Sequence, residues 1–496
     1  MKEICYISTR GDKSVFSSSQ AIVRGIAEDG GLFVPTEMPK LSSDLNTLIE
    51  LNYRDLAYEI LKLFLTDFTE EELKYCINSA YDEKFDTPVI APIAKAKDNY
   101  FLELFHGPTL AFKDMALTIL PYLLKTSAKK LNIDSEIVIL TATSGDTGKA
   151  ALEGFANIDG IKIIVYFPQN GVSEVQKKQM ITQEGFNTYV VGIEGNFDDA
   201  QSGVKNIFTD EDFNGKLKEK GFMFSSANSI NIGRLVPQVV YYFYAYAQMC
   251  KSGDIKVGDE INFVVPTGNF GNILAGYYAK ELGLPVGKLI CASNENKVLF
   301  DFMATGTYDK KRAFILTMSP SMDILISSNL ERLLYTLSGQ DSSKVKDLMD
   351  KLNSNGVYNI SDDMKQALKD FVGGYASEEN TTKAIKDVFE NSDYLMDTHT
   401  AVAYSVYKEY KDSSGDDRKT VIVSTASPYK FTANVMKAID SKYDGQDEFE
   451  LMNEMETLSK VIIPESIRDL NTKPILHTTI CAKDEMKQQV EKILNI

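Results

Sequence analysis

The sequence predicts an open, doubly wound α/β protein, because strand-like and helical segments alternate along most of its length. From about residue 99 onward, short runs of β-branched and other apolar residues are followed by segments with helical spacing. Uninterrupted apolar strands between helices are typical of parallel sheets that are covered on both faces. Loops that carry Gly, Ser, Thr or Asn follow three of these strands. Since ligands bind beyond the carboxyl ends of the strands in such sheets, we expect the functional site there.

The strand-like runs and the loops after them define the core of the chain. The runs span residues 136–143, 162–168, 187–195, 261–268, 288–294 and 419–427. The loops SGDTG, TGNFGN and STAS begin at residues 144, 267 and 424. The opening hundred residues combine a Ser-rich start, the turn DGGLFVP and helix-like stretches, and the tail is acidic and then helical. We therefore expect an N-terminal domain over 1–98, a catalytic core over 99–435 and a C-terminal extension over 436–496.

The composition is that of a globular protein with an acidic balance. The 496 residues include 53 Lys and Arg against 70 Asp and Glu, for a formal net charge of −17, and no basic block occurs. Nucleic acids and anionic membranes are bound through clustered cations, so neither is an expected partner. The five cysteines form no C-x-x-C pair and only three histidines occur, so no disulfide framework or metal site is expected. The chain has neither a signal-peptide core nor a long apolar run, which predicts a cytoplasmic protein.

Lys113 is the most unusual residue of the core, because of its place in the stretch HGPTLAFKDMALTIL at residues 106–120. Gly107 and Pro108 break regular structure at the start of this stretch, and we expect the apolar run after them to form a buried helix. A lysine in a helix most often lays its methylenes on apolar neighbours and extends its charge to water. Here Leu110, Phe112 and Met115 are among the apolar residues that surround it on every helical face. If the amine is buried, its pKa falls, and the neutral form can attack a carbonyl to give a Schiff base.

The glycine-containing loops indicate anion sites. TGNFGN follows a strand and opens a helical stretch, so its backbone can hold a phosphate, although a plain glycine-rich turn is the alternative. SGDTGKA differs from a triphosphate-binding loop at Thr143 and Ala150, and its hydroxyls and amides suit a carboxylate. A nucleophilic lysine, a phosphate cradle and a carboxylate cradle together indicate a pyridoxal-phosphate enzyme that acts on an amino acid.

Longer blocks extend this pattern over most of the chain. They are ISTRG, DGGLFVP, HGPTLAFKDMAL, LTATSGDTGKAAL, GVSEVQKKQM, IEGNFDDAQ, NSINIGRLVPQVVYYF, VPTGNFGNILAG, SPSMDILISSNLERLLY and DTHTAVAY. Through these blocks the sequence resembles the threonine synthase family in its longer, microbial and fungal form. The resemblance implies pyridoxal-phosphate fold type II, with two doubly wound α/β lobes and an extra N-terminal module. It also implies the last step of threonine biosynthesis, in which O-phospho-L-homoserine and water give L-threonine and phosphate by γ-elimination and β-addition.

The resemblance also implies roles for individual residues. Lys113 would be the Schiff-base lysine and Thr425 would face the pyridine nitrogen. The cofactor phosphate would be surrounded by Gly268, Asn269, Phe270, Gly271 and Asn272. The candidates for the substrate carboxylate and the phenolic oxygen of the cofactor are Ser144, Gly145, Asp146 and Thr147. The candidates for the substrate phosphate are Lys149, Arg234 and, less favoured, Arg332, with Ser319 and Ser321 as neutral donors. For these cations a structural role, such as an ion pair of Arg332 with Glu331, is the alternative.

Four positions carry further expectations. Ser427 and Thr398 stand where the family commonly has a histidine and a proline. An ionised Asp146 beside a phenolate would be repelled, so we expect this carboxyl group to be protonated, or bound to backbone amides and turned away. His399 is expected to be a structural residue.

Three other classes of protein are compatible with parts of the pattern. A serine or threonine dehydratase or a cysteine synthase would share the lysine and both loops, but lacks the N-terminal module and the SPSMDI block. An inactive amino-acid or phosphate-binding protein and a nucleotide-dependent kinase are the remaining alternatives. We expect a monomer or weak homodimer.

Overall fold

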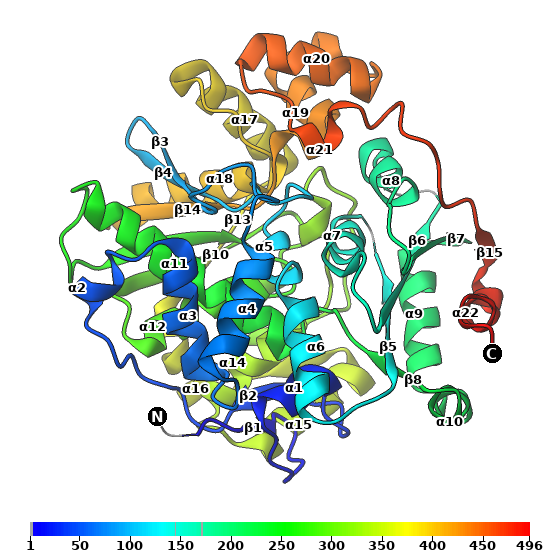
Figure 1. Ribbon diagram of the computed structural model, residues 1–496. Helices are drawn as coiled ribbons and strands as arrows, with labels where there is room; N and C mark the ends of the chain where they lie inside the picture. Colours follow the sequence, from blue (N-terminus) through cyan, green and yellow to red (C-terminus); the bar gives the residue numbers. More distant parts are fainter. Residues whose placement is uncertain (1–2, 144, 170–171) are drawn as a thin grey trace.

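Residues 3–143, 145–169 and 172–496 are described by the structure, a computed structural model with two α/β lobes (Figure 1). Each lobe is built around its own sheet, and neighbouring strands run parallel except at one edge of the larger sheet. The expected α/β class with two doubly wound lobes is therefore confirmed. All six strands expected from the sequence are present, although some end earlier than expected.

The larger sheet joins segments that are far apart in the sequence. Its strands, in spatial order, are β13 (Phe371–Tyr375), β10 (Val286–Ser293), β9 (Ile261–Pro266), β14 (Thr420–Ser424), β4 (Asn99–Glu103) and β3 (Ile93–Ala96). Successive side chains of β9 contribute to different hydrophobic clusters, Phe263 to one and Val264 to another, as expected for a strand covered on both faces. The helix α11 (Ile232–Lys251) packs on α12 (Gly271–Leu282), and α18 (Thr398–Ser414) packs on β9.

The smaller sheet lies beside the larger one and is parallel throughout (Figure 1). Its strands, in spatial order, are β15 (Ile480–Ala482), β7 (Thr188–Glu194), β6 (Ile161–Pro168), β5 (Glu136–Ala142) and β8 (Phe222–Ser225). The helix α7 (Asp146–Phe155) packs on β6, and α9 (Phe197–Phe208) packs on β5 and β6. Because α7 follows β5 in the chain, its first turn lies at the carboxyl end of that strand.

The N-terminal module consists of a two-stranded antiparallel sheet and four helices. These are β1 (Tyr6–Ser8), β2 (Phe33–Pro35), α1 (Ser18–Arg24), α2 (Leu45–Leu48), α3 (Tyr53–Phe64) and α4 (Glu70–Ala80). Capping boxes at Ser17 and Thr69 begin α1 and α4. The module packs on the core through α3 against α11, and Arg10 forms a 2.8 Å ion pair with Glu331. Since the module shares a hydrophobic cluster with the core, the boundary at residue 98 stays a proposal.

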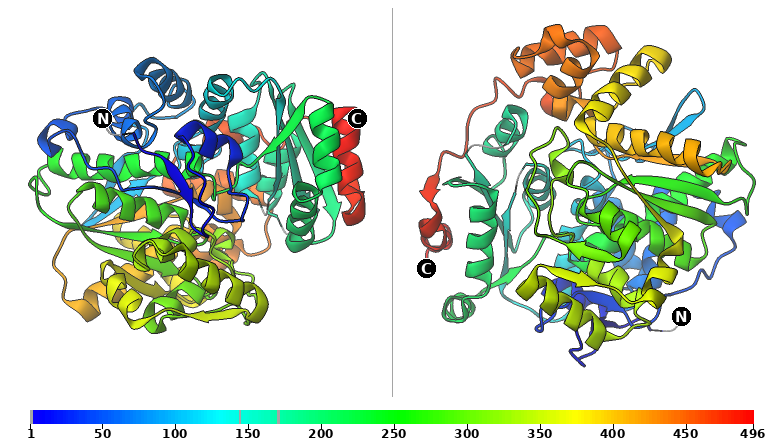
Figure 2. Two further views of the ribbon diagram at one scale, coloured as in Figure 1. Left: turned by 90° about the horizontal axis from the view of Figure 1, so that it is seen from below. Right: turned by 180° about the vertical axis from the view of Figure 1, so that it is seen from behind.

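The C-terminal tail reaches from one lobe to the other. The helices α20 (Glu448–Ser459) and α21 (Glu465–Arg468) lie near α19 (Thr432–Ile439), and the chain then runs along the outside of the smaller lobe to β15 and α22 (Met486–Leu494) (Figures 1 and 2). There the Tyr166 hydroxyl donates a 2.7 Å hydrogen bond to the Met486 carbonyl. The boundary at residue 435 likewise stays a proposal.

The other elements connect these parts. They are α5 (Asp114–Leu117), α6 (Leu120–Lys130), α8 (Glu174–Ile181), α10 (Glu211–Glu219), α13 (Val298–Thr305), α14 (Leu330–Leu337), α15 (Ser342–Asn355), α16 (Asp362–Ala367), α17 (Glu378–Ser392), β11 (Thr307–Asp309), β12 (Val357–Asn359) and the short 3-10 turns η1 (Pro320–Met322) and η3 (Pro428–Phe431). Within the described residues, no helix is both long and apolar enough to cross a membrane.

Candidate active site

Lys113 lies in a turn beyond the carboxyl end of β14. The break expected at Gly107 and Pro108 extends further than predicted, because Leu110 has φ +61° and α5 begins only at Asp114. The expectation that the apolar run places Lys113 inside a helix is therefore wrong. The Phe112 N–H donates to the Thr425 carbonyl (2.8 Å), and the Ser427 N–H donates to the Leu110 carbonyl (3.0 Å). These two bonds hold the lysine segment against the STAS loop and bring Thr425 next to it.

The Lys113 amine is shielded from water and lies between two acceptors. Its side chain is 12% exposed, and Nζ lies 3.4 Å from Asp146 Oδ2 and 3.2 Å from Ser321 Oγ. Burial lowers the pKa of Lys113, as do the positive charges of Lys430 and Arg234, against the opposing effect of Asp146. The lowered pKa agrees with the expectation of a buried amine, and makes neutral amine available for attack on a carbonyl.

Asp146 is ionised and held by side chains. Oδ1 lies 2.8 Å from Lys430 Nζ and accepts a 2.9 Å bond from Gln176 Nε2, while Oδ2 accepts a 3.1 Å bond from Ser321 Oγ. Burial opposes ionisation, but Lys430 and Lys113 outweigh it and hold the pKa of Asp146 well below its usual range. The expectation of a protonated carboxyl group is therefore wrong. The donors to the Asp146 carboxylate are side chains and not the backbone amides of the other expectation.

Gly145 and Gly148 of the SGDTG loop are held by Thr143, which precedes the loop. Thr143 Oγ1 accepts hydrogen bonds from the N–H groups of Gly145 (2.9 Å) and Gly148 (2.8 Å). Gly145 has φ +138°, and a Cβ there would stand 2.5 Å from the Gln176 side chain. The loop therefore needs glycine at this position. Thr147 follows in the first turn of α7; Ser144 lies outside the described residues.

The TGNFGN loop has the geometry of an anion cradle. Phe270 has φ +65° and precedes α12, whose first-turn N–H groups have no intrahelical acceptor. The carbonyls of Gly268 and Asn269 accept bonds from Ser327 Oγ (2.7 Å) and the Asn329 N–H (3.0 Å). Those bonds hold the carbonyls away from the helix start.

Two details of this loop connect it to the rest of the site. A Cβ on Gly268 would stand 2.6 Å from the carbonyl oxygen of Ser321, the residue whose hydroxyl contacts Lys113. The Oδ1 atom of Asn272 accepts bonds from the hydroxyls of Tyr241 (2.8 Å) and Tyr242 (2.7 Å), whereas its buried Nδ2 has no partner among the described residues. An unpaired buried amide donor at the start of a helix fits a phosphate oxygen.

The cations expected to bind the substrate phosphate are in different environments. Arg234 is buried and donates to the Ala227 carbonyl (2.9 Å), but its Nε has no partner in the part of the chain that the structure describes. Burial lowers the pKa of Arg234 to about 10. Lys149 forms a 2.8 Å ion pair with Glu153 and also contacts Gln183. Of these two, Arg234 is the cation with free donor capacity.

Arg332 and the two serines complete the set of candidates. Arg332 donates to the carbonyls of Phe33 and Ile230 and to Asn329. The alternative of a local ion pair between Arg332 and Glu331 is wrong, because Glu331 pairs with Arg10. Ser321 lies at Lys113, whereas Ser319 Oγ accepts a 3.0 Å bond from Asn294 Nδ2.

His399 has a structural role, as expected. Its Nδ1 lies 2.9 Å from Asp397 Oδ1, and its Nε2 accepts a 3.1 Å bond from the Ser321 N–H. A ring with Nδ1 protonated and Nε2 as acceptor satisfies both contacts. His399 thereby fixes the backbone of the serine that contacts Lys113.

Sequence reasoning missed Lys430, Gln176 and Thr143. Lys430 lies three residues beyond the STAS loop, in the turn η3 that Ser427 begins by accepting the Tyr429 N–H (3.3 Å). Gln176 is part of the capping box of α8. Proximity to the STAS loop was the available signal for Lys430, but its contact with Asp146 joins distant parts of the chain.

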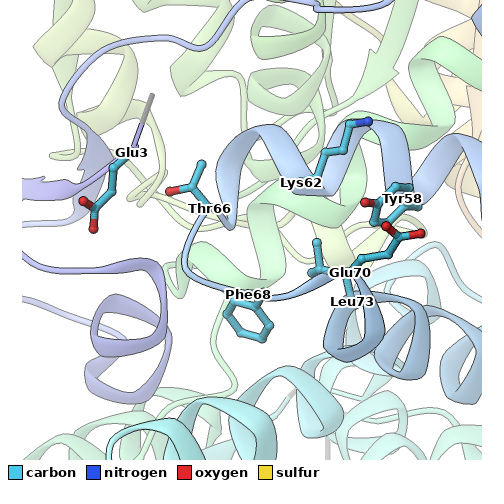
Figure 3. A pocket seen from close by; sticks show the side chains of 7 residues that line it. All are labelled: Glu3, Tyr58, Lys62, Thr66, Phe68, Glu70 and Leu73. Carbon is cyan, nitrogen blue, oxygen red and sulfur yellow. The ribbon is translucent and has the colours of Figure 1, made fainter. Parts of the chain in front are cut away.

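A surface pocket of about 380 Å³ lies elsewhere, between α3, α4 and the start of the chain (Figure 3). It is lined by Glu3, Tyr58, Lys62, Thr66, Phe68, Glu70 and Leu73. None of these residues belongs to the Lys113 cluster, so this pocket is separate from the candidate active site.

Comparison with known protein families assigns the class. The sequence matches the pyridoxal-phosphate dependent enzyme family over residues 84–426, threonine synthase N terminus over 5–81 and threonine synthase, C-terminal over 400–486. The chain thus belongs to the pyridoxal-phosphate-dependent enzymes, and the expected fold type II is confirmed.

Individual relatives narrow the assignment. A threonine synthase of Pseudomonas aeruginosa is 39% identical over 87% of this chain and 90% of its own length. The crystal structure of pyridoxal-phosphate-bound threonine synthase from Brucella melitensis has a TM-score of 0.88 and 34% identity, with 99% of both chains covered. Within its class, the chain therefore belongs to the threonine synthase family. It also matches threonine synthase-like 1 of Pongo abelii, 40% identical over 95% of this chain, but spans only 63% of that relative's length.

Proposed function

We propose that the protein converts O-phospho-L-homoserine and water to L-threonine and phosphate, the last step of threonine biosynthesis. The observation that carries the proposal is the charge of the buried cluster. Lys113 and Lys430 share one carboxylate, Asp146, and Arg234 has no ion pair in the described part of the chain. A cluster with more cations than carboxylates, inside a protein of net charge −17, suits a substrate and a cofactor that both carry phosphate.

The cofactor supplies an aldehyde that condenses with an amine and a ring that withdraws electrons from the bound amino acid. Lys113 would provide the amine and, once the substrate has displaced it, would take the proton from the substrate Cα and later return it there. A proton is lost from Cβ and one is gained at Cγ as the phosphate leaves, and water then adds at Cβ. The N–H groups from Gly268 to Asn272 and Asn272 Nδ2 hold the cofactor phosphate. Thr425, fixed next to the lysine segment, offers a hydroxyl to the pyridine nitrogen.

The substrate is held by the other candidates. The backbone and hydroxyls of Ser144, Gly145 and Thr147 receive its carboxylate, and glycine at 145 permits the close approach. Arg234 binds its phosphate through the donors that have no protein partner. Lys149 would add a second cation if its pair with Glu153 opens. Asp146 orients the Lys113 amine and, being ionised, does not donate a proton.

The location, oligomeric state and partners of the enzyme are inferred from the family and from the net charge. We infer a cytoplasmic enzyme, a monomer or weak homodimer, whose partner is the small-molecule substrate and not a nucleic acid or a membrane. The acidic net charge and the lack of a basic block support this inference.

The test is a comparison of substrates. We expect the purified protein with pyridoxal phosphate to release phosphate from O-phosphohomoserine, with threonine as the co-product in equal amount. Turnover of O-acetylserine or deamination of threonine at a higher kcat/KM would identify a different fold type II enzyme. Lys113→Ala should abolish the reaction.

A further inference from the structure

We propose that Lys430 is a positioning residue for this reaction: it neutralises Asp146, so that the Lys113 amine stands beside this carboxylate without being fixed as an ammonium ion. The inference rests on the proposed function for its catalytic meaning, but its structural basis is independent. Lys430 is fully buried, and Nζ lies 2.8 Å from Asp146 Oδ1 and donates a 2.9 Å bond to the Thr109 carbonyl. A lysine so deeply buried requires a charge partner.

Asp146 is shared unequally between the two lysines. Its Oδ1 is 2.8 Å from Lys430, whereas its Oδ2 is 3.4 Å from Lys113. Because the Coulomb interaction weakens with distance, the Lys430 pair takes the larger share of the carboxylate charge. Bonds from Gln176 to Oδ1 and from Ser321 to Oδ2 fix the orientation of the carboxylate and maintain this difference.

Without Lys430, the site would contain a buried lysine beside an unshared carboxylate. An opposite charge at contact distance favours the charged form of a lysine and would hold the proton on Nζ. An ammonium ion is neither a nucleophile nor a base. Lys430 therefore allows Asp146 to orient Nζ of Lys113 without holding a proton on that nitrogen.

The charged groups around Lys113 come from several elements. Asp146 on α7 favours the ammonium form, and Lys430 on η3 and Arg234 on α11 oppose it. His399 on α18 meets the cluster through Ser321, whose N–H its Nε2 accepts. The pKa of Lys113 is lowered mainly by burial, so Lys430 adds to an existing tendency and counteracts Asp146.

The test measures the protonation of Lys113 directly. The full chain, freed of cofactor, is acetylated with trace acetic anhydride at a series of pH values, and the label on Lys113 is quantified by peptide mass spectrometry. The pH midpoint of labelling reports the pKa of the amine, whatever the absolute rate. We compare the unaltered protein with Lys430→Gln, which keeps a hydrogen-bond donor but removes the charge, and with Lys430→Arg, which keeps the charge. The matched control is Lys437→Gln, because Lys437 is exposed and pairs with Asp444.

We expect Lys430→Gln to raise the Lys113 midpoint by at least about one pH unit, with Lys430→Arg and the control close to the unaltered protein. An unchanged midpoint in a folded Lys430→Gln protein overturns the proposal, and so does an equal rise in Lys430→Arg. If Lys430→Gln does not fold, Asp146→Asn decides: removing the carboxylate next to Nζ must lower the midpoint, and failure to lower it also overturns the proposal. Since no substrate is used, failure of this test and failure of the proposed function are distinguishable.

Discussion

Replacing Arg234 by methionine should stabilise the cofactor-free protein while it impairs substrate binding. In the described structure Arg234 has one hydrogen bond, an unpaired Nε and no ion pair. Burial lowers its pKa from 12.5 to about 10. At 1.36 kcal/mol per pKa unit, this shift means that the charged form destabilises the folded state by about 3 kcal/mol at neutral pH. After subtraction of about 2 kcal/mol for the lost hydrogen bond of this charged donor, Arg234→Met should raise the free energy of unfolding by about 1 kcal/mol.

Arg332 is the matched control. It is equally buried and its pKa is also lowered to about 10, but it donates to two carbonyls and to Asn329. Loss of three bonds from a charged donor removes about 6 kcal/mol, twice the gain from removing the charge. Arg332→Met should therefore lower the free energy of unfolding by about 3 kcal/mol. The two arginines differ in the number of their hydrogen bonds, and not in residue type or burial.

The assay is urea unfolding of the full chain without cofactor, followed by circular dichroism, together with steady-state kinetics of the loaded enzyme. In Arg234→Met, loss of charge-assisted bonds to the substrate phosphate should raise KM for O-phosphohomoserine roughly 30- to 150-fold, for about 2–3 kcal/mol. A loss of stability in Arg234→Met equal to that in Arg332→Met would refute the reasoning. A larger loss of cofactor affinity than of substrate affinity would assign Arg234 to the cofactor phosphate instead.

Further predictions concern the HGPT turn and the phosphate cradle. Burial opposes the charge of His106, but Asp86 and Glu103 outweigh it and raise its pKa to about 9. Its contribution to stability is complete below pH about 6.5 and is lost as the pH rises through 9, so unfolding experiments should show a decline of at most about 3 kcal/mol that is absent in His106→Asn. Gly268→Ala should lower cofactor affinity at least about tenfold, because its Cβ would stand 2.6 Å from the Ser321 carbonyl. At Gly215 a Cβ would meet no atom within 4 Å apart from its chain neighbours and the backbone of its own helix, so Gly215→Ala should leave the cofactor affinity measured by equilibrium dialysis unchanged.

The parts of the fold that could be predicted from sequence are those with a local signal. The run EIVILTA contains four consecutive apolar residues and forms β5, and TGNFGN leads from a strand into a helix as its glycines indicated. The start of α5 could not be predicted, because it depends on a left-handed Leu110 and on two bonds to the STAS loop. The strand β15 has three residues and forms only by pairing with β7.

The charge state of Asp146 shows the same limit at the site. For a carboxyl group next to a phenolate, the local sequence predicts a group that is protonated, or bound to backbone amides and turned away. The structure brings Lys430 to Oδ1 from a distant part of the sequence and keeps the group ionised. A single sequence carries no pattern for such a contact, whereas Lys113 itself stood out because its neighbours are apolar.

The most direct test is to locate the lysine that binds the cofactor. The full chain is incubated with pyridoxal 5′-phosphate, reduced with borohydride and digested, and the labelled peptide is identified by mass spectrometry. We expect one label, on Lys113, and its loss in Lys113→Ala with the fold intact. A stoichiometric label on Lys430 or on an exposed lysine, with Lys113 unmodified, would contradict the assignment of the active site.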